Sequence, residues 1–254
     1  MRVLAREPQK FVTLLAHFSL RRLRLLSGLV LFAYIGLHLL NHALGMFSLA
    51  LAEGGLRIAL VFWRIPLMTA ILYGAAAVHF ALALRTLYTR REWNLPWVEI
   101  LRLASGFSFP LLLIGHVVKT RLADTLFDVT PSYLTIITNL QMAGAQGTQL
   151  ALLAPGWLHG CLGLWITLRR FELMRRVKYI LVAFTAALPL LAAAGFFRMA
   201  AEINTRDMPA LARATALEQA ALAAWKDDLT YAYVFAVLAA VALGRLRALI
   251  ANSA

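Results

Sequence analysis

Acidic residues and cysteine are scarce in this sequence. Asp and Glu number 12 among 254 residues, against 25 Lys and Arg, and Cys161 is the single cysteine. One cysteine excludes an internal disulfide and any iron–sulfur cluster held by cysteine ligands. Residues 1–20 also lack the compact apolar core and the small-residue cleavage site of a secretory signal peptide. Neither a disulfide framework nor a cleaved leader is therefore expected.

Apolar residues dominate the chain instead. They make up 61% of it, and the mean hydropathy is +0.74. Crossing about 30 Å of hydrocarbon takes about 20 helical residues. Six mostly apolar runs of this kind lie near residues 26–47, 65–87, 103–122, 149–168, 178–197 and 229–248. The sequence predicts an all-α, polytopic membrane protein with six transmembrane helices, embedded in the lipid bilayer.

The basic residues are distributed unevenly between the connecting segments. With the N-terminus in the cytoplasm, the inner segments carry 17 of the 25 Lys and Arg residues but only 4 of the 12 acids. This asymmetry is the positive-inside pattern of membrane proteins, so both termini are predicted to be cytoplasmic. Topology accounts for the whole net charge of +13, and no nucleic-acid partner is expected from the high pI.

Three segments are predicted along the chain. Residues 1–24 are expected to form a cytoplasmic amphipathic helix, because apolar residues recur at helical spacing within residues 11–18. His17 lies in this helix and is expected at the membrane interface. Residues 25–250 form the six-helix membrane domain, and residues 251–254 form a cytoplasmic tail.

Two connections are long, and both are predicted to lie outside. They are residues 123–148 and 198–228. In the second, Asp207 and Pro209 are helix-start signals ahead of an alanine-rich segment, which predicts a surface helix.

Histidine is concentrated in the first four predicted spans. The five are His38 and His42 in span one, His79 in span two, His116 in span three and His159 in span four. Counted from the cytoplasmic end, His79 and His159 lie about 12 and 13 Å deep, whereas His38, His116 and His42 lie about 18, 20 and 24 Å deep. A bis-histidine haem needs two ligands at similar height on facing helices. The depths predict two stacked haems in a four-helix bundle, with His79 and His159 as inner ligands and His38 and His116 as outer ligands.

His42 shares a helix face with His38, so facing direction does not distinguish the two as ligands. Height favours His38 weakly as the ligand, which leaves His42 to contact a propionate or a quinone. Zinc is a poorer fit, because no span has a well-placed acid. Structural histidines in a non-haem protein, such as a transporter with a proton relay, remain an alternative, although acids are nearly absent from the spans.

Cations are expected near the haem propionates, which are buried carboxylates that need charged partners. Lys119 and Arg121 follow His116 and are nominated for the outer haem, with Arg85 and Arg169 as weaker candidates for the inner one. Side chains of the type that binds a quinone near the outer face are Asn41, Tyr34, Lys119, Arg121 and Asp124.

Four segments carry a resemblance to a known family. "RRLRLLSG…HLLN", "HFALAL", "HVVKTRL" and "HGCLGLW" resemble the ligand segments of the dihaem cytochrome b subunits of succinate:quinone and quinol:fumarate oxidoreductases. The resemblance covers roughly residues 20–170. It implies that spans one and three, and spans two and four, supply the two ligand pairs, and it aligns His38 with a ligand.

The sequence departs from that family by its sixth span and by His42. Six spans with "LHLLNHALG" look closer to the quinone-responsive dihaem-b membrane anchors of bacterial class III adenylate cyclases. That resemblance implies two haem b groups, exchange of electrons with the quinone pool, a bacterial inner membrane, and signalling to a C-terminal cyclase domain or a dimer partner. No cyclase is expected within this chain, so it carries no catalytic residues of its own.

Three functions are therefore weighed. The first is a redox-sensing membrane module, which the sixth span and the basic segment after it favour. The second is the electron-transfer anchor of a succinate dehydrogenase or fumarate reductase. The third is a non-haem membrane transporter, which a purified protein without Soret absorbance would favour.

Overall fold

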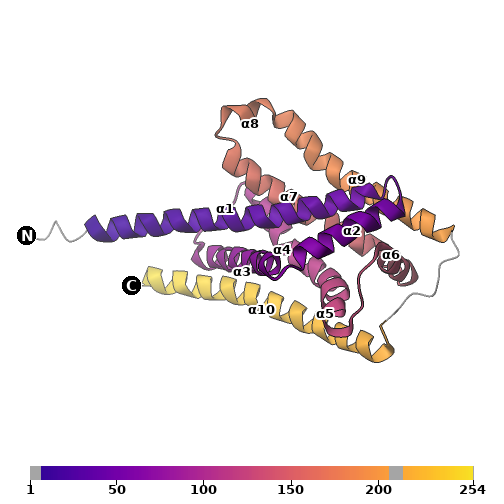
Figure 1. Cartoon of the computed structure of the whole chain (residues 1–254). Coiled ribbons are helices and arrows are strands. Elements are labelled where there is room, and N and C mark those ends of the chain that lie inside the picture. The colour runs from indigo at the N-terminus through magenta and orange to yellow at the C-terminus, as the bar shows by residue number, and fades with distance from the viewer. Residues whose placement is uncertain (1–6, 206–213, 254) are drawn as a thin grey trace, which may run out of the picture. The chain divides into compact units, whose positions relative to one another are not determined.

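The computed structural model describes residues 7–205 and 214–253, and the side chains of residues 20–205 and 214–251. Over these ranges the chain is helical and contains no strand (Figure 1). In chain order the elements are α1 (Glu7–Leu44), α2 (Leu49–Trp63), α3 (Pro66–Thr89), α4 (Trp97–Val117), the π-helix η1 (Val118–Leu122), α5 (Ala123–Phe127), α6 (Tyr133–Met142), α7 (Gln146–Leu168), α8 (Glu172–Arg176), α9 (Lys178–Asn204) and α10 (Ala216–Ser253).

Six helices are long and apolar enough to cross a membrane, so the predicted all-α, polytopic membrane fold is confirmed. They are Leu20–Leu44, Pro66–Thr89, Trp97–Phe127, Gln146–Leu168, Lys178–Asn204 and Ala216–Ala251. Most exceed the predicted spans, because the helices continue past the apolar run into polar residues. The sixth exceeds its prediction most, because α10 already begins at Ala216, and the third is also longer, since η1 and α5 prolong α4 without a break.

Helix α1 is continuous from Glu7 to Leu44, so the predicted N-terminal helix and the first span belong to one helix. The side chains of residues 7–19, including His17, lie outside the described part, as do Asp207 and Pro209. The amphipathic face and the helix-start signals remain predictions.

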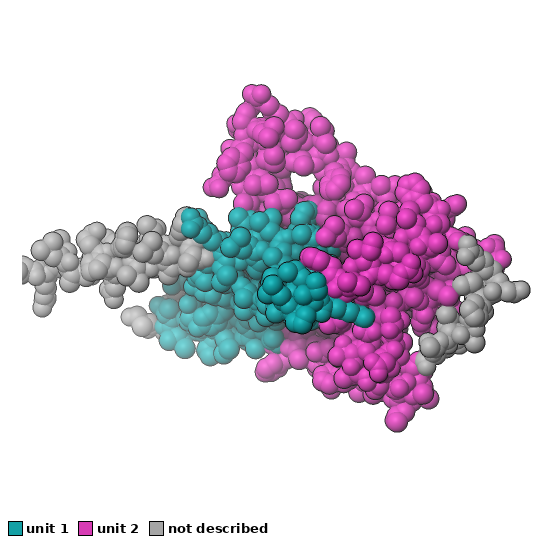
Figure 2. All heavy atoms as spheres, viewed as in Figure 1, with its two compact units in different colours: residues 1–34, 63–91, 236–254 teal, residues 35–62, 92–235 magenta. Residues whose placement is uncertain are grey.

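The chain divides into two compact units (Figure 2). Unit 1 comprises residues 1–34, 63–91 and 236–254, which include all of α3, the N-terminal part of α1 and the C-terminal part of α10. Unit 2 comprises residues 35–62 and 92–235, which include the remaining helices and the parts of α1 and α10 that unit 1 lacks.

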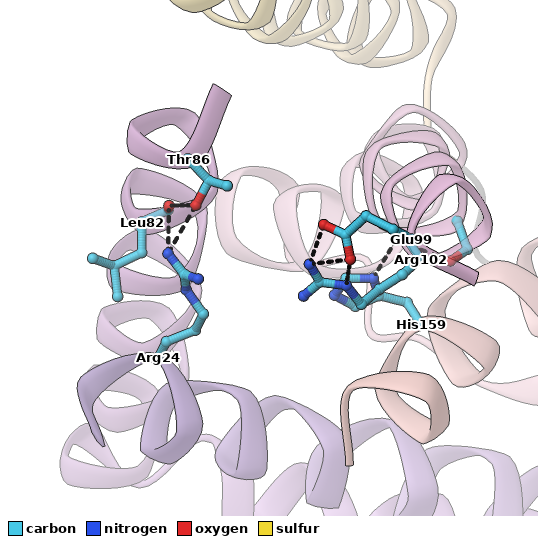
Figure 3. A network of polar contacts seen from close by, with 7 residues as sticks. Arg24, Leu82, Thr86, Glu99, Arg102 and His159 are labelled. Carbon is cyan, nitrogen blue, oxygen red and sulfur yellow. Dashed lines mark hydrogen bonds and ion pairs between the residues drawn. The ribbon is translucent and has the colours of Figure 1, made fainter. Parts of the chain in front are cut away.

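Close contacts fix the helices of unit 1. A Cβ at Gly244 of α10 would lie 2.6 Å from the carbonyl oxygen of Tyr88, so only glycine permits this approach to α3. The Arg247 guanidinium lies 4.9 Å from the centre of the Tyr88 ring, a cation–π contact. Arg24 of α1 donates to Thr86 Oγ1 at 2.8 Å and to the Leu82 carbonyl at 3.2 Å (Figure 3). These contacts join α1, α3 and α10.

Two short helices build the core of unit 2. Helix α2 has 15 residues, or about 22 Å, which is too short to cross a bilayer. Its first amide, at Leu49, donates to Glu202 of α9 at 2.8 Å, and its own Glu53 accepts from the Leu134 amide at the start of α6 at 3.0 Å. Carboxylates are favourable at helix N-termini because they satisfy unpaired amides. Apolar side chains of α2, α6 and α9, such as Ala52, pack between these caps.

Proline and glycine determine how α9 packs in unit 2. Pro189 lacks an amide hydrogen, which frees the Thr185 carbonyl, and Trp157 Nε1 of α7 donates to that oxygen at 3.0 Å. Further along, a Cβ at Gly195 would lie 2.1 Å from the His42 carbonyl oxygen. A Cβ at Gly45 would in turn lie 2.8 Å from the Gly195 carbonyl oxygen. The backbones of α1 and α9 therefore meet directly beside His42.

Candidate functional site

Three of the five membrane histidines meet within unit 2. The ring centres of His38 and His116 lie 5.8 Å apart, and those of His38 and His42 lie 4.6 Å apart. The i, i+4 spacing on α1 explains the second contact, since it places His38 and His42 one turn apart on the same face. His42 Nε2 lies 3.2 Å from His38 Nε2, so one ring donates to the other. The structure thus brings together the two predicted outer ligands and their neighbour.

A phenol and an amide surround His42. The Tyr133 ring centre lies 5.3 Å from that of His42, and Asn41 Nδ2 donates to the Tyr133 hydroxyl at 2.8 Å and to the Ala52 carbonyl at 3.3 Å. Tyr133 is 3% exposed, and this burial raises its pKa above the ordinary value; Asn41 opposes the rise and Glu53 adds to it. The phenol therefore remains neutral and keeps its proton.

His42 carries a polar atom without a partner. It is 9% exposed, and its Nδ1 is buried with no hydrogen-bonding group in reach. Buried polar atoms are normally paired, because an unpaired one costs about 1–3 kcal/mol. The unpaired Nδ1 of His42 lies beside a neutral phenol, so a bound ligand or water could pair with it.

His116 is held by the amide of Gln149 on α7. The distance from Gln149 Nε2 to His116 Nδ1 is 2.9 Å. Behind the ring, the His116 carbonyl accepts from Thr120 Oγ1 at 2.7 Å, and the helix changes to the π-helix η1 two residues after His116. Single π-turns of this kind occur often at functional positions, because they redirect a side chain without ending the helix.

His159 is held by a backbone carbonyl of α4. Its Nδ1 lies 2.9 Å from the Arg102 carbonyl oxygen, and a carbonyl can only accept, so Nδ1 carries the hydrogen (Figure 3). Arg102 makes a bidentate ion pair with Glu99, its Nη2 lying 2.7 Å from Oε1 and its Nε 3.0 Å from Oε2. A Cβ at Gly106 would lie 2.6 Å from His159 Nδ1, so glycine makes room for the ring.

His79 has a comparable arrangement inside unit 1. Its Nδ1 lies 3.2 Å from Ser27 Oγ, which donates its own hydrogen to the Arg24 carbonyl at 3.1 Å. The hydroxyl has one hydrogen, so in this arrangement it accepts from Nδ1–H of His79. A Cβ at Gly28 would lie 3.2 Å from His79 Cε1, and this glycine therefore lets the ring lie against α1.

These hydrogen bonds determine which ring nitrogens can bind a metal. With Nδ1 protonated, the neutral rings of His79 and His159 present the lone pair of Nε2, as in metal-bound histidines whose second nitrogen donates to an oxygen. For His116 the choice rests with the Gln149 amide, which presents either hydrogen or oxygen to Nδ1. His79 and His159 therefore fit haem iron on this chemistry. As placed, Gln149 Nε2 faces His116 Nδ1, so coordination through His116 Nε2 needs the amide turned to present its oxygen.

The spacing of His38 and His116 also fits. Two metal–nitrogen bonds of about 2 Å, with about 1 Å from each nitrogen to its ring centre, place two imidazoles about 6 Å apart. The observed separation is 5.8 Å. In the described ranges no group of three His, Cys, Asp or Glu side chains, the three clustered histidines included, has the geometry to hold a metal ion, whereas a haem iron takes two side-chain ligands.

The other predicted residues lie as follows. Lys119 is exposed and Arg121 half-buried, and both belong to η1 directly after His116. Tyr34 lies in unit 1 in edge-to-face contact with Trp63, at 5.1 Å between ring centres, and is not part of the histidine cluster. Asp124 lies in α5. The predicted inner ligands fall in different units, His79 in unit 1 and His159 in unit 2.

Three glycines border open space on their helices. At Gly74, Gly115 and Gly163 an added Cβ would meet nothing within 4 Å, so open space borders α3, α4 and α7 there. At Gly36 a Cβ would lie 3.4 Å from the Trp157 ring, so that glycine serves helix packing instead.

Comparisons with family models, curated proteins and solved structures found no match to this chain.

Sequence reasoning missed Tyr133, Gln149, Ser27 and Glu53. Gln149 gave a signal, since an amide at the start of an apolar span needs a partner. Ser132 gave another: its side chain accepts from the Thr135 amide at 3.0 Å as a helix N-cap, which marks the start of α6 at Tyr133. Nothing in the sequence links Tyr133 to His42.

Proposed function

We propose that this chain is a dihaem b-type cytochrome module that exchanges electrons with the quinone pool. The observation that carries the proposal is the pair of imidazoles His38 and His116, on two membrane helices, at the separation that one iron requires. The tautomers imposed on His79 and His159 support it further. Bound haem b supplies reversible one-electron chemistry.

The residues of the chain have distinct roles in this proposal. His38 and His116 would hold the outer iron: His38 Nε2 would exchange its hydrogen bond with His42 for the iron, and Gln149 would keep the His116 ring oriented through Nδ1. His79 and His159 hold the inner iron; that pairing rests on their equal depth in the sequence and on their matching Nδ1–H donors. Lys119 and Arg121 supply positive charge to the outer propionates, because they follow His116 within one turn or so of helix.

Quinone exchange is assigned to the outer end of α1. His42 offers an unpaired buried nitrogen, and Tyr133 offers a neutral hydroxyl held by Asn41. A quinone has two carbonyl oxygens that accept hydrogen bonds, and a quinol has two hydroxyls that donate them. His42 and Tyr133 therefore match both forms of the molecule, and His42 lies against the proposed outer ligand His38.

The cellular setting is also part of the proposal. The charge asymmetry supports cytoplasmic termini, and the resemblance to cyclase anchors supports the inner membrane of a bacterium. The proposed output is a C-terminal adenylate cyclase, supported by that resemblance alone. In this setting the chain is a redox sensor and membrane anchor.

Haem quantitation tests the proposal directly. The purified chain, expressed in haem-replete cells, should give a pyridine haemochrome ratio of about two haem b per chain, one for each bis-histidine pair. Quinol addition should reduce the bound haem. A colourless protein of normal yield would contradict the proposal, and a ratio near one would restrict it to the outer pair.

A further inference from the structure

Helices α4 and α7 exchange hydrogen bonds at two levels. Near the start of α4, the Arg102 carbonyl accepts from His159 of α7 at 2.9 Å. Near the end of α4, His116 Nδ1 lies 2.9 Å from Gln149 Nε2 of α7. Residue numbers rise along one helix as they fall along the other, so the helices are antiparallel. Each helix carries one iron ligand and supplies the partner of the other helix's ligand.

The two partners differ in one chemical respect. The Arg102 carbonyl is an acceptor only, which leaves a single tautomer for His159. The Gln149 side chain is an amide, so it is a donor at one end and an acceptor at the other. If the amide hydrogen faces His116, the hydrogen of the ring sits on Nε2 and blocks that nitrogen. If the amide oxygen faces it, Nδ1–H donates and Nε2 is open to coordinate.

Because of this choice, Gln149 has a role that the backbone partner does not have. Acceptance of Nδ1–H makes the imidazole a stronger electron donor and favours the oxidised iron. As placed, Gln149 Nε2 faces His116 Nδ1 at 2.9 Å. We propose that Gln149 is the positioning residue of the outer site: with its amide turned so that the oxygen takes the place of the nitrogen, it orients His116 and lowers the reduction potential of the iron that His116 holds. This inference rests on the proposed haem function.

Optical redox titration of the purified full chain tests the inference with three variants. Gln149→Leu removes the acceptor, so the outer haem should shift to a higher midpoint potential and leave its site about 10-fold faster when apomyoglobin is added as the acceptor. Gln149→Glu keeps an oxygen at the same position, so its potential should stay at or below that of the wild type. Gln146→Leu, three residues earlier on the same helix, is the matched control and should change neither haem. The inner haem should be unaffected in all three.

The outcomes separate the inference from the function on which it rests. Absence of haem from the wild type removes the proposed function. Two haems in the wild type, with unchanged potentials in Gln149→Leu, overturn the role of Gln149 alone. A rise in both Gln149→Leu and Gln149→Glu also overturns it, because a general packing defect would act in that way. If Gln149→Leu yields no folded protein, a Gln149→Glu potential above that of the wild type is the overturning result.

Discussion

The surroundings of His79 in unit 1 differ from those of the histidine cluster in unit 2 in the polar groups that they contain. Ser27, which is 5% exposed, fixes the His79 ring through Nδ1. The cluster places three imidazoles together with a phenol and two amides. A buried ligand needs only a tautomer and room for its ring, whereas a site that meets a second molecule needs further donors and acceptors. On the proposed function, the first region would store an electron and the second would exchange it with a quinone.

Removal of a ligand from each region should separate the two most clearly. His116→Ala and His79→Ala should each reduce the haem content from about two to about one per chain, because one axial ligand does not sustain low-spin coordination. Low-temperature optical spectra should show that the two variants lose different components. Loss of the same component in both would mean that the ligand pairs are wrong.

Within the cluster, His38 and His42 should behave unlike one another. His38→Ala should lose the outer haem, since its ring faces His116, whereas His42→Ala should retain both haems and slow reduction by quinol. Haem content and stopped-flow reduction by a soluble quinol measure the two effects. The reverse pattern would exchange the roles of His38 and His42 and leave the dihaem assignment intact.

Tyr133→Phe should affect exchange without affecting ligation. The change removes the hydroxyl that accepts from Asn41, at a cost of about 1 kcal/mol in stability, and it slows reduction by quinol about 10-fold if the hydroxyl holds the quinone. Tyr231→Phe, on an exposed ring of α10, is the control. An unchanged rate with a lowered melting temperature would make Tyr133 a packing residue only.

The smallest effect is expected beside His79. Ser27→Ala removes one hydrogen bond from Nδ1, which should raise the midpoint potential of the inner haem by roughly 40 mV, the equivalent of about 1 kcal/mol for one electron. Redox titration at the wavelength of the inner component provides the measurement. Ser27→Thr keeps the hydroxyl and should restore the wild-type value; a shift that persists in Ser27→Thr would refute the hydrogen-bond explanation.

The sequence predicted the spans and their number because hydropathy over 20 residues is a strong signal, independent of tertiary contacts. The meeting of His38 and His116 was likewise expected from depth, since rise per residue is nearly constant along a helix. Helix α2 was not predicted, because its 15 residues are too few for a span and carry no loop signal. Its role depends on Glu53 and on Glu202, which is far away in the sequence.

The missing parts of the site have the same origin. Tyr133 reaches Asn41 across 92 residues, and no local pattern encodes that separation. Ser27 donates to the carbonyl of Arg24, only three residues away, but its role in the site comes from its contact with His79 on another helix. A polar side chain in an apolar span indicates that a partner exists, but tertiary packing determines which residue that partner is.

The contact of Gly195 with the His42 carbonyl has a consequence for mutational screening. Even alanine would bring a methyl group to 2.1 Å from that oxygen, and backbone is on both sides of the contact, so few substitutions at this position should be tolerated. A saturation library scored by colony colour alone would therefore give Gly195 the same blank profile as an iron ligand. Scoring the same library for protein abundance as well would separate them, since a lost ligand leaves pale protein and a lost helix crossing leaves little protein at all.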